Sequence, residues 1–182
     1  RFMLLSPNNL LKPSDGGPVA VPSQDMVLGI YYLTQERPGS KGEGRYFHNF
    51  NEAVLAFENK DITFHSRINV RMTKTMPDGR EVTGIVNSTY GRFLFNEIIP
   101  QDLGNVNRQI PGNELLLEID EHVGKNQLKK ILGQVINVHG ATITAEVLDR
   151  IKAMGYKYST LAALTVSVSD MIVPAEKQQM IE

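Results

Sequence analysis

The chain has 182 residues, which suits one domain or two small ones, and 41% of them are hydrophobic, an ordinary share for a globular protein. Its formal net charge is −1 at pH 7, so the chain as a whole has no basic field that would bind nucleic acid unaided. It contains no cysteine, which excludes a disulfide framework, a thiolate metal site and a cysteine nucleophile.

The first residues predict the end of a helix. Residues 1–6 are mostly apolar and Pro7 follows them, and helices usually stop at or before the residue that precedes a proline. The chain opens in the middle of this pattern and without an initiator methionine, so we expect an excised fragment of a longer protein. Asn8 comes next, in a loop rich in turn-forming residues.

The following segment predicts a helix that runs to Thr34. Ser23 places a hydroxyl before the first free N–H groups of this helix, so we expect it to be the N-cap, with Gln24 at the first helical position. Asp25 falls in the first turn, where the helix dipole favours a carboxylate. Gly29 costs a helix about 1 kcal/mol relative to alanine, which indicates that another backbone packs close to it. The apolar face consists of Met26, Val27, Ile30 and Tyr31.

A β-hairpin is predicted in the middle of the chain. Apolar residues alternate from position 62 to 72, with a break at Ser66, which is typical of a half-buried strand. Residues 77–79, Pro-Asp-Gly, favour a turn because proline presets φ and glycine accepts a positive φ. We therefore expect an antiparallel partner strand from about residue 80 to residue 88.

Short helices are predicted on both sides of this hairpin. Asn51 is expected to cap a helix over residues 52–59. Residues 90–99 are an apolar stretch that Pro100 ends, which indicates a second short helix. Residues 101–120 are polar and irregular, and we expect no regular element there.

Residues 124–138 carry the clearest helical pattern in the chain. Their apolar residues recur at i, i+3, i+4, i+7 and i+8, and Gly140 lies just past the end. A second helix is expected to begin with Thr144 as its N-cap and to end with Gly155 at its C′ position.

The end of the chain completes the predicted fold class. Residues 160–168 are expected to be extended, and Pro174 to open a last helix. The longest charge-free run, residues 158–169, is too short and too rich in serine and threonine to span a bilayer. The order of helices, hairpin and helices indicates an α+β fold rather than a repeating parallel sheet.

No residue pattern indicates a catalytic or metal site. The four histidines lie far apart and show no His-Glu-Xaa-Xaa-His spacing, so no metal site is expected. His139 lies in the last turn of its predicted helix, where a positive charge is favourable. No Gly-Xaa-Ser-Xaa-Gly sequence occurs, so nucleophilic catalysis has no candidate. Lys125, Lys129 and Lys130 form a basic side, either a solvated face or a contact for nucleic acid or another protein.

Several stretches are specific enough to indicate a family. They are Asn8-Asn9, residues 21–34 (Val-Pro-Ser-Gln-Asp and its continuation), residues 41–44 (Lys-Gly-Glu-Gly), residues 89–100 (Thr-Tyr-Gly-Arg and Phe-Asn-Glu-Ile-Ile-Pro), residues 144–158 (with Leu-Asp-Arg-Ile-Lys) and residues 170–174. They resemble the segment of the bacterial RNA polymerase β′ subunit that follows its catalytic magnesium loop. The resemblance covers nearly the whole chain.

This resemblance implies a role in transcription. In the family the region ends the active-site domain, here residues 1–34, then forms the pore beneath the catalytic centre, here residues 35–168, and begins the funnel, here residues 169–182. Nucleotides are thought to enter there and backtracked RNA to leave. The resemblance implies that Asn8 and Gln24 line this channel, whereas the residues alone favour a turn asparagine and an ordinary first-turn glutamine.

The resemblance also implies the partners. The enzyme would be a DNA-directed RNA polymerase, a nucleotidyltransferase of the bacterial cytoplasm. The partners of this chain would be the remainder of β′, the β, α and ω subunits, DNA, RNA and nucleoside triphosphates. No membrane would be involved. The family's magnesium motif is absent from the sequence. Mg²⁺ and Zn²⁺ would therefore be held by residues outside it, and the chain alone is expected to be inactive and free of cofactors.

The alternative is a stand-alone α+β module that docks on another protein and has no catalytic activity. The two possibilities differ in their expected surfaces. A scaffold taken from a larger subunit should expose apolar side chains on many faces, whereas a docking module should have a polar surface with one compact apolar patch.

Overall fold

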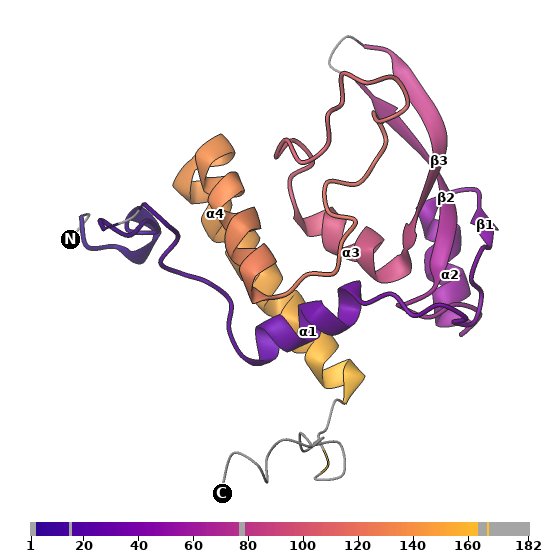
Figure 1. Cartoon of the computed structure of the whole chain (residues 1–182), viewed down its shortest axis with the longest axis horizontal. Helices are drawn as coiled ribbons and strands as arrows, with labels where there is room; N and C mark the ends of the chain where they lie inside the picture. Colours follow the sequence, from indigo (N-terminus) through magenta and orange to yellow (C-terminus); the bar gives the residue numbers. More distant parts are fainter. Residues whose placement is uncertain (1–2, 15, 77–78, 164–166, 168–182) are drawn as a thin grey trace, which may run out of the picture.

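The computed structural model describes residues 3–14, 16–76, 79–163 and 167. Within them the elements are η1 (Ser6–Asn8), α1 (Asp25–Thr34), β1 (Tyr46–Phe47), α2 (Phe50–Glu58), β2 (Arg67–Thr75), β3 (Glu81–Thr89), α3 (Tyr90–Ile98) and α4 (Lys125–Ala162). This content confirms the predicted α+β class. In Figure 1, α1 crosses α4 near the centre, the sheet and α2 lie on one side, and the segment before α1 extends away on the other. Across the described ranges, no helix is long and apolar enough to cross a membrane.

The sheet has three strands in the order β1-β2-β3. The antiparallel pairing of β2 with β3 confirms the predicted hairpin, with Arg67 opposite Thr89 and Thr75 opposite Glu81. Sequence reasoning missed β1, which pairs parallel to β2, because a two-residue strand carries no alternation. Of the predicted turn, Pro77 and Asp78 lie outside the described residues.

The predicted start of the first strand is wrong by several residues. The stretch before Arg67 is a turn, not a strand. The Ser66 hydroxyl accepts from the Thr63 N–H at 3.0 Å and donates to the Lys41 carbonyl at 2.6 Å, which holds that turn closed. The break in alternation at Ser66 was therefore the true strand boundary.

The structure corrects two predictions near helix starts. In α2 the N-cap is Asn49 rather than Asn51, because the Asn49 side chain accepts from the Glu52 N–H at 2.8 Å. The Glu52 carboxylate in turn accepts from the His48 N–H at 2.6 Å, which satisfies a second donor at that end. Of the helix end predicted over residues 1–6, residues 1 and 2 lie outside the described residues. The prediction is wrong for residues 3–5, which are not helical, and only the short 3-10 turn η1 follows. The helix α3 matches its prediction, and Thr89 caps it.

The element α4 consists of two helical arms, residues 125–139 and 141–162, on either side of a kink. Gly140 has φ 78° and ψ −176° at this kink, which confirms that the first helix ends there. Thr144 is not an N-cap acceptor, since its hydroxyl donates to the Gly140 carbonyl at 2.7 Å. Gly155 is not a C′ residue either, because the second arm continues to Ala162.

The last predictions fall partly outside the described residues. Residues 160–162 are helical, so the prediction of an extended segment from residue 160 is wrong for these residues. The helix expected from Pro174 lies outside the described residues.

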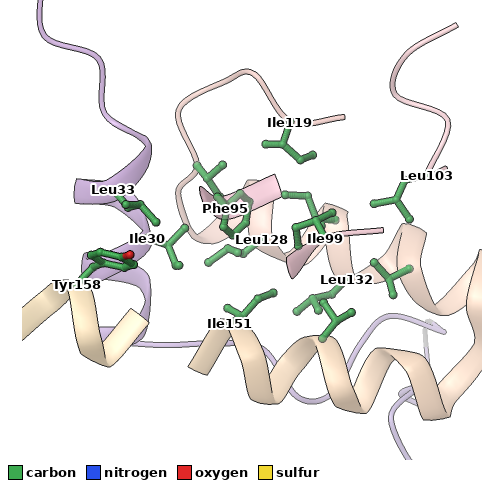
Figure 2. Packing of buried hydrophobic residues seen from close by; sticks show 14 residues of the cluster. Ile30, Leu33, Phe95, Ile99, Leu103, Ile119, Leu128, Leu132, Ile151 and Tyr158 are labelled. Carbon is green, nitrogen blue, oxygen red and sulfur yellow. The ribbon is translucent and has the colours of Figure 1, made fainter. Parts of the chain in front are cut away.

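Two hydrophobic clusters hold these elements together. The first joins α1, α3, both arms of α4 and the long loop before α4, and Figure 2 shows Ile30 and Leu33 of α1 beside Tyr158 and Phe95 beside Leu128. The second lies between the sheet, α2 and α3 and includes Phe47, Ile68, Val70, Val86 and Phe93. Because α3 contributes to both clusters, it fixes the sheet relative to the crossing of α1 and α4.

Gly29 lies where α1 crosses the second arm of α4, as its position in the sequence predicted. A Cβ atom at Gly29 would lie 1.9 Å from the carbonyl oxygen of Gly155, and one at Gly155 would lie 2.5 Å from the carbonyl oxygen of Met26. The two backbones therefore touch without intervening side chains, and only glycine permits this approach.

Candidate functional site

Gln24 occupies the N-cap position of α1 rather than its first helical position. It has φ 49° and ψ −122°, a backbone conformation that favours glycine, and its side chain is exposed. No side chain caps this helix, so the prediction that Ser23 does so is wrong. Ser23 takes part only through its carbonyl, which accepts from the Met26 N–H at 3.2 Å. The sharp turn at Gln24 accounts for the displaced helix start.

The start of α1 and the start of α4 border one pocket. This α1–α4 pocket has a volume of about 540 Å³ and is lined by Gln24, Val27, Leu28, Tyr31, Gly124 and Lys125. It brings together residues about one hundred positions apart in the sequence, which no local pattern could indicate. Lys125, one of the three lysines of the predicted basic side, is exposed here, and Lys129 and Lys130 are also exposed.

The electrostatics of the α1–α4 pocket favour anions weakly. Each helix start leaves backbone N–H groups without partners in the helix and carries a partial positive charge. The Lys125 ammonium adds a full charge, whereas the exposed Asp25 carboxylate in the first turn of α1 opposes it. At the α4 start, the Gly124 N–H donates to the Gln127 side chain at 3.3 Å, so one donor is already occupied.

Tyr31 gives this pocket a fixed aromatic wall. Its ring centroid lies 4.0 Å from that of His122, and the His122 Nε2 atom lies 3.1 Å from the Tyr31 carbonyl oxygen. The second contact anchors the His122 ring to the α1 backbone, and the first places that ring against the Tyr31 ring at the pocket edge. The pocket thus combines an uncharged amide, an aromatic ring, one ammonium group and two helix starts. These groups can form weak contacts with a phosphate or a base.

Asn8 lies elsewhere. It is exposed in η1, and its N–H donates to the Leu5 carbonyl at 3.0 Å. The cavity beside this segment has a volume of about 310 Å³, and its lining includes Ser6, Leu10 and Lys152 but neither Asn8 nor Gln24. The structure thus does not bring the two predicted channel residues together in one pocket.

A cluster of two arginines and two carboxylates was not foreseen. Arg92 of α3 is buried, and its Nη1 atom donates to Glu36 at 3.2 Å and to Asp120 at 3.3 Å. Its Nε atom donates to the Thr34 carbonyl at 3.1 Å. Arg67 donates to the same two carboxylates at 2.8 and 3.4 Å. This Arg92 cluster ties the end of α1, β2, α3 and the long loop together, so its role is structural.

His65 is a further polar residue to which sequence reasoning gave no role. It is 5% exposed, and its Nδ1 atom lies 2.9 Å from the Gln35 carbonyl oxygen. A carbonyl can only accept, so Nδ1 carries the proton and Nε2 is an acceptor. Nε2 is buried and has no hydrogen-bond partner among the residues that the structure describes.

The environment of His65 predicts a pH-dependent stability. Burial lowers the pKa of His65 below its ordinary value of 6.5, and the nearby Arg37 charge lowers it further, against the opposing effect of the Gln35 carbonyl. Below pH 6.5 the unfolded chain then binds more protons than the folded chain, so the free energy of unfolding should fall as the pH drops from 6.5 toward the folded-state pKa. Urea midpoints measured across this window check the direction.

The matched control for this pH effect is His65→Gln. The variant lacks the titrating ring, so the difference in urea midpoint between it and the parent chain should shrink as the pH falls below 6.5. A difference that stays constant over this range would show that His65 does not titrate in the expected direction.

The described residues contain no group of three or more histidine, aspartate or glutamate side chains that could hold a metal ion. His139 has a single carboxylate beside it, with Nε2 2.6 Å from the Asp102 carboxylate oxygen.

Comparison with known proteins agrees with the resemblance in the sequence. A model of the family "RNA polymerase Rpb1, domain 3" matches residues 9–171. The DNA-directed RNA polymerase subunit beta′ of Lachnoclostridium phytofermentans is 65% identical over all 182 residues, which are 14% of that protein. The same subunit of Acetivibrio thermocellus is 56% identical over 182 residues, 16% of that protein. The chain thus spans less than one fifth of the length of these curated relatives. Because the family model matches most of its residues, the chain belongs to the family of RNA polymerase Rpb1, domain 3.

Proposed function

We propose that this chain is a segment of the β′ subunit of a bacterial DNA-directed RNA polymerase, where it forms part of the wall of the pore, or secondary channel, near the active centre. The identity with two β′ subunits over its whole length supports the assignment to that subunit. The observation that carries the wall role is the α1–α4 pocket, where two helix starts and Lys125 meet around an exposed Gln24. The N-terminal end of a helix attracts anions such as phosphate groups.

A channel wall must contact nucleotides without retaining them. Gln24 suits this task because its amide can both donate and accept but carries no charge. The Asp25 carboxylate, which lies next to it, opposes tight binding of a phosphate. The pocket therefore guides anions better than it binds them.

The rest of the proposal follows from the parent enzyme. The remainder of β′, the β, α and ω subunits, DNA, RNA and nucleoside triphosphates would be its partners in the bacterial cytoplasm. Mg²⁺ and Zn²⁺ would be bound by residues outside this chain, which would contribute no catalytic group. Residues 1–34, 35–168 and 169–182 would be the end of the active-site domain, the pore and the start of the funnel. The packing of α1 on α4 would then join the first two of these regions.

The exposed apolar side chains favour a scaffold over a stand-alone docking module. Leu4 is 90% exposed before α1, Leu55 is 59% exposed on α2, Ile85 is 61% exposed on β3 and Leu161 is 60% exposed at the end of α4. They lie in four separate parts of the chain, three of them helices or strands, rather than in one stretch. A surface of this kind fits a segment that is covered on several sides by the rest of a larger subunit.

Gln24→Leu tests the wall role. In the assembled polymerase that carries this chain, the substitution should change the elongation rate or the recovery from backtracked pauses, because it removes both hydrogen-bonding groups of the amide. The free energy of unfolding of the chain should change by no more than about 0.5 kcal/mol, because Gln24 is exposed and leucine inherits the same backbone strain. Single-molecule elongation traces and urea unfolding measure the two effects.

Gln109→Leu is the matched control, since Gln109 is an exposed glutamine outside the pocket. It should leave elongation and pausing unchanged. If Gln24→Leu unfolds early in urea while the enzyme elongates normally, Gln24 is a packing residue and the wall role of this pocket is wrong.

A further inference from the structure

A second cavity lies beside the second hydrophobic cluster, where α2, β2 and α3 meet. This α2–α3 groove has a volume of about 390 Å³ and shares no residue with the α1–α4 pocket. Its floor consists of the buried side chains of Phe93, Ile99 and Leu117, and its rim of the more exposed side chains of Phe50, Met72 and Glu97.

The apolar part of the rim is held in place but not covered. The Phe50 ring stacks on the Tyr90 ring with their centroids 5.9 Å apart, and the Phe93 ring centroid also lies 5.9 Å from it. Part of Phe50 nevertheless remains open, as does part of Met72, a side chain that adapts to many shapes. A restrained apolar pocket of this kind receives the anchor side chain of a partner at protein interfaces.

The two amide side chains of the groove are already engaged. The Asn96 side chain donates to the Ile119 carbonyl at 2.7 Å and accepts from the Ile119 N–H at 3.0 Å. The Gln101 side chain donates to the Ile99 carbonyl at 3.0 Å and accepts from the Glu118 N–H at 3.1 Å. Neither amide therefore needs a hydrogen bond from an occupant of the groove.

Glu97 differs from these amides. Its carboxylate has no ion pair and no hydrogen bond within the part of the chain that the structure describes, although it lines an apolar groove. Burial raises the pKa of the Glu97 carboxyl above its ordinary value of 4.5, and no cation among the described residues lowers it. A cation placed beside this carboxylate would stabilise its ionised form.

The surroundings of Glu97 make the potential more negative. Burial raises the pKa of the Tyr90 phenol to about 12, and the Tyr158 phenol and the Glu97 and Glu58 carboxylates contribute to this rise. One carboxylate from α2 and one from α3 thus act on the same phenol. A positively charged group would be attracted to this side of α3.

We propose that a segment from the remainder of the β′ subunit occupies the α2–α3 groove, with an apolar side chain on the floor and an arginine beside Glu97. Arginine fits better than lysine, because its planar guanidinium can bond both carboxylate oxygens and also lie against the Phe50 ring. A nucleic acid would bring phosphates to Glu97, and no cation lines the groove among the described residues.

The size of the parent subunit supports this source of the occupant. The chain spans less than one fifth of the length of its β′ relatives, so most of such a subunit lies outside it. The inference therefore rests on the proposed function, but it concerns a different cavity and a contact within the subunit rather than the channel.

Oxidation of Met72 by peroxide tests whether the groove is covered. In the isolated 182-residue chain Met72 is partly exposed and should form the sulfoxide, whereas in the assembled polymerase that carries this chain the reaction should be several-fold slower. Mass spectrometry of the peptide that contains Met72 measures both rates. A polymerase that elongates RNA with Met72 as reactive as in the isolated chain would overturn this inference and leave the proposed function intact. A chain that does not assemble with the other subunits would overturn both.

A photochemical crosslink identifies the occupant. A diazirine side chain of about the size of methionine, encoded in place of Met72, should join the chain to a β′ peptide with an arginine close to the crosslinked residue. The same group in place of Thr73, which faces the other side of β2, should not reach that peptide. A crosslink to the β subunit or to nucleic acid, or the absence of any crosslink, would overturn the inference.

A reversal of charge tests the pairing with Glu97. In the polymerase, Glu97→Arg should make Met72 oxidation several-fold faster, and replacement of the crosslinked arginine by glutamate in the same enzyme should slow it again. Glu81→Arg, at an exposed position outside the groove, should leave the rate unchanged. If the second substitution does not restore the protection of Met72, Glu97 does not pair with that arginine and the proposed contact is wrong.

Glu97→Gln provides a milder variant that separates the contact from folding. It should not lower the urea midpoint of the isolated chain, because the carboxylate has no cation there. In the polymerase it should speed Met72 oxidation, because the arginine would lose its counter-ion. Equal protection of Met72 in the parent and Glu97→Gln polymerases would show that the charge of Glu97 does not hold the occupant.

Discussion

Gly29→Ala should lower the free energy of unfolding of the chain by about 3 kcal/mol, the upper end of the usual range for overpacked sites. The added Cβ atom would lie 1.9 Å from the Gly155 carbonyl oxygen and 2.9 Å from the Ser159 backbone nitrogen. Both atoms belong to the backbone of α4 and cannot turn aside as a side chain can. The helices would have to separate, which would open the first hydrophobic cluster around Ile30. Urea unfolding measures the loss.

Gly133→Ala is the control for this substitution. Gly133 also lies within a helix, but apart from the adjacent backbone of its own helix no atom of the described residues lies within 4 Å of the position that its Cβ would take. Alanine there should stabilise the chain by about 0.5–1 kcal/mol, because it raises helix propensity and restricts the unfolded chain. Opposite signs for the two substitutions are expected. A small effect of Gly29→Ala would mean that α1 and α4 are not in backbone contact.

Arg92→Met should also cost about 3 kcal/mol, because it removes the buried partner of two carboxylates. The Arg92 side chain is only 7% exposed, whereas Glu36 and Asp120 are 30% and 40% exposed. The carboxylates can therefore recover part of their hydration, which places the expected loss at the lower end of the range for broken buried pairs. The Thr34 carbonyl would lose a donor as well. Thermal or urea unfolding measures the change.

Arg45→Met provides the comparison for Arg92→Met. Arg45 forms an ion pair with Asp61 at 3.8 Å, but the two side chains are about half exposed. Its loss should change stability by no more than about 0.5 kcal/mol, as is usual for exposed pairs. Equal losses for the two substitutions would show that the Arg92 cluster is solvated and does not hold the elements together.

The proposed wall depends on the crossing of α1 and α4. This crossing places Gln24, at the start of α1, beside Lys125, at the start of α4. Because α1 is short and packed along its buried face, a disturbance at Gly29 should reach Gln24 as well. The variants at exposed positions are therefore the sharper probes of function.

The sequence by itself determined the local features of this protein. Apolar periodicity located the first arm of α4, the alternating residues located most of the hairpin, and Gly29 indicated a close backbone contact. These signals are local, because the apolar periodicity of a helix or a strand can be recognised within a short stretch of sequence. The wording of residues 21–34 and 89–100 was specific enough to indicate the family, which the comparisons then confirmed.

Only the tertiary structure decided the features that depend on distant residues. Arg92 meets the Thr34 carbonyl 58 residues away, and the Val123 N–H meets the Thr34 hydroxyl 89 residues away. Caps were also misplaced, at Ser23, Asn51 and Thr144, because several neighbouring residues could cap a helix and the path of the incoming chain selects among them. The positive φ of Gln24, the α1–α4 pocket and the lack of a partner for His65 Nε2 among the described residues all arise from that packing, and no pattern along the sequence indicates them.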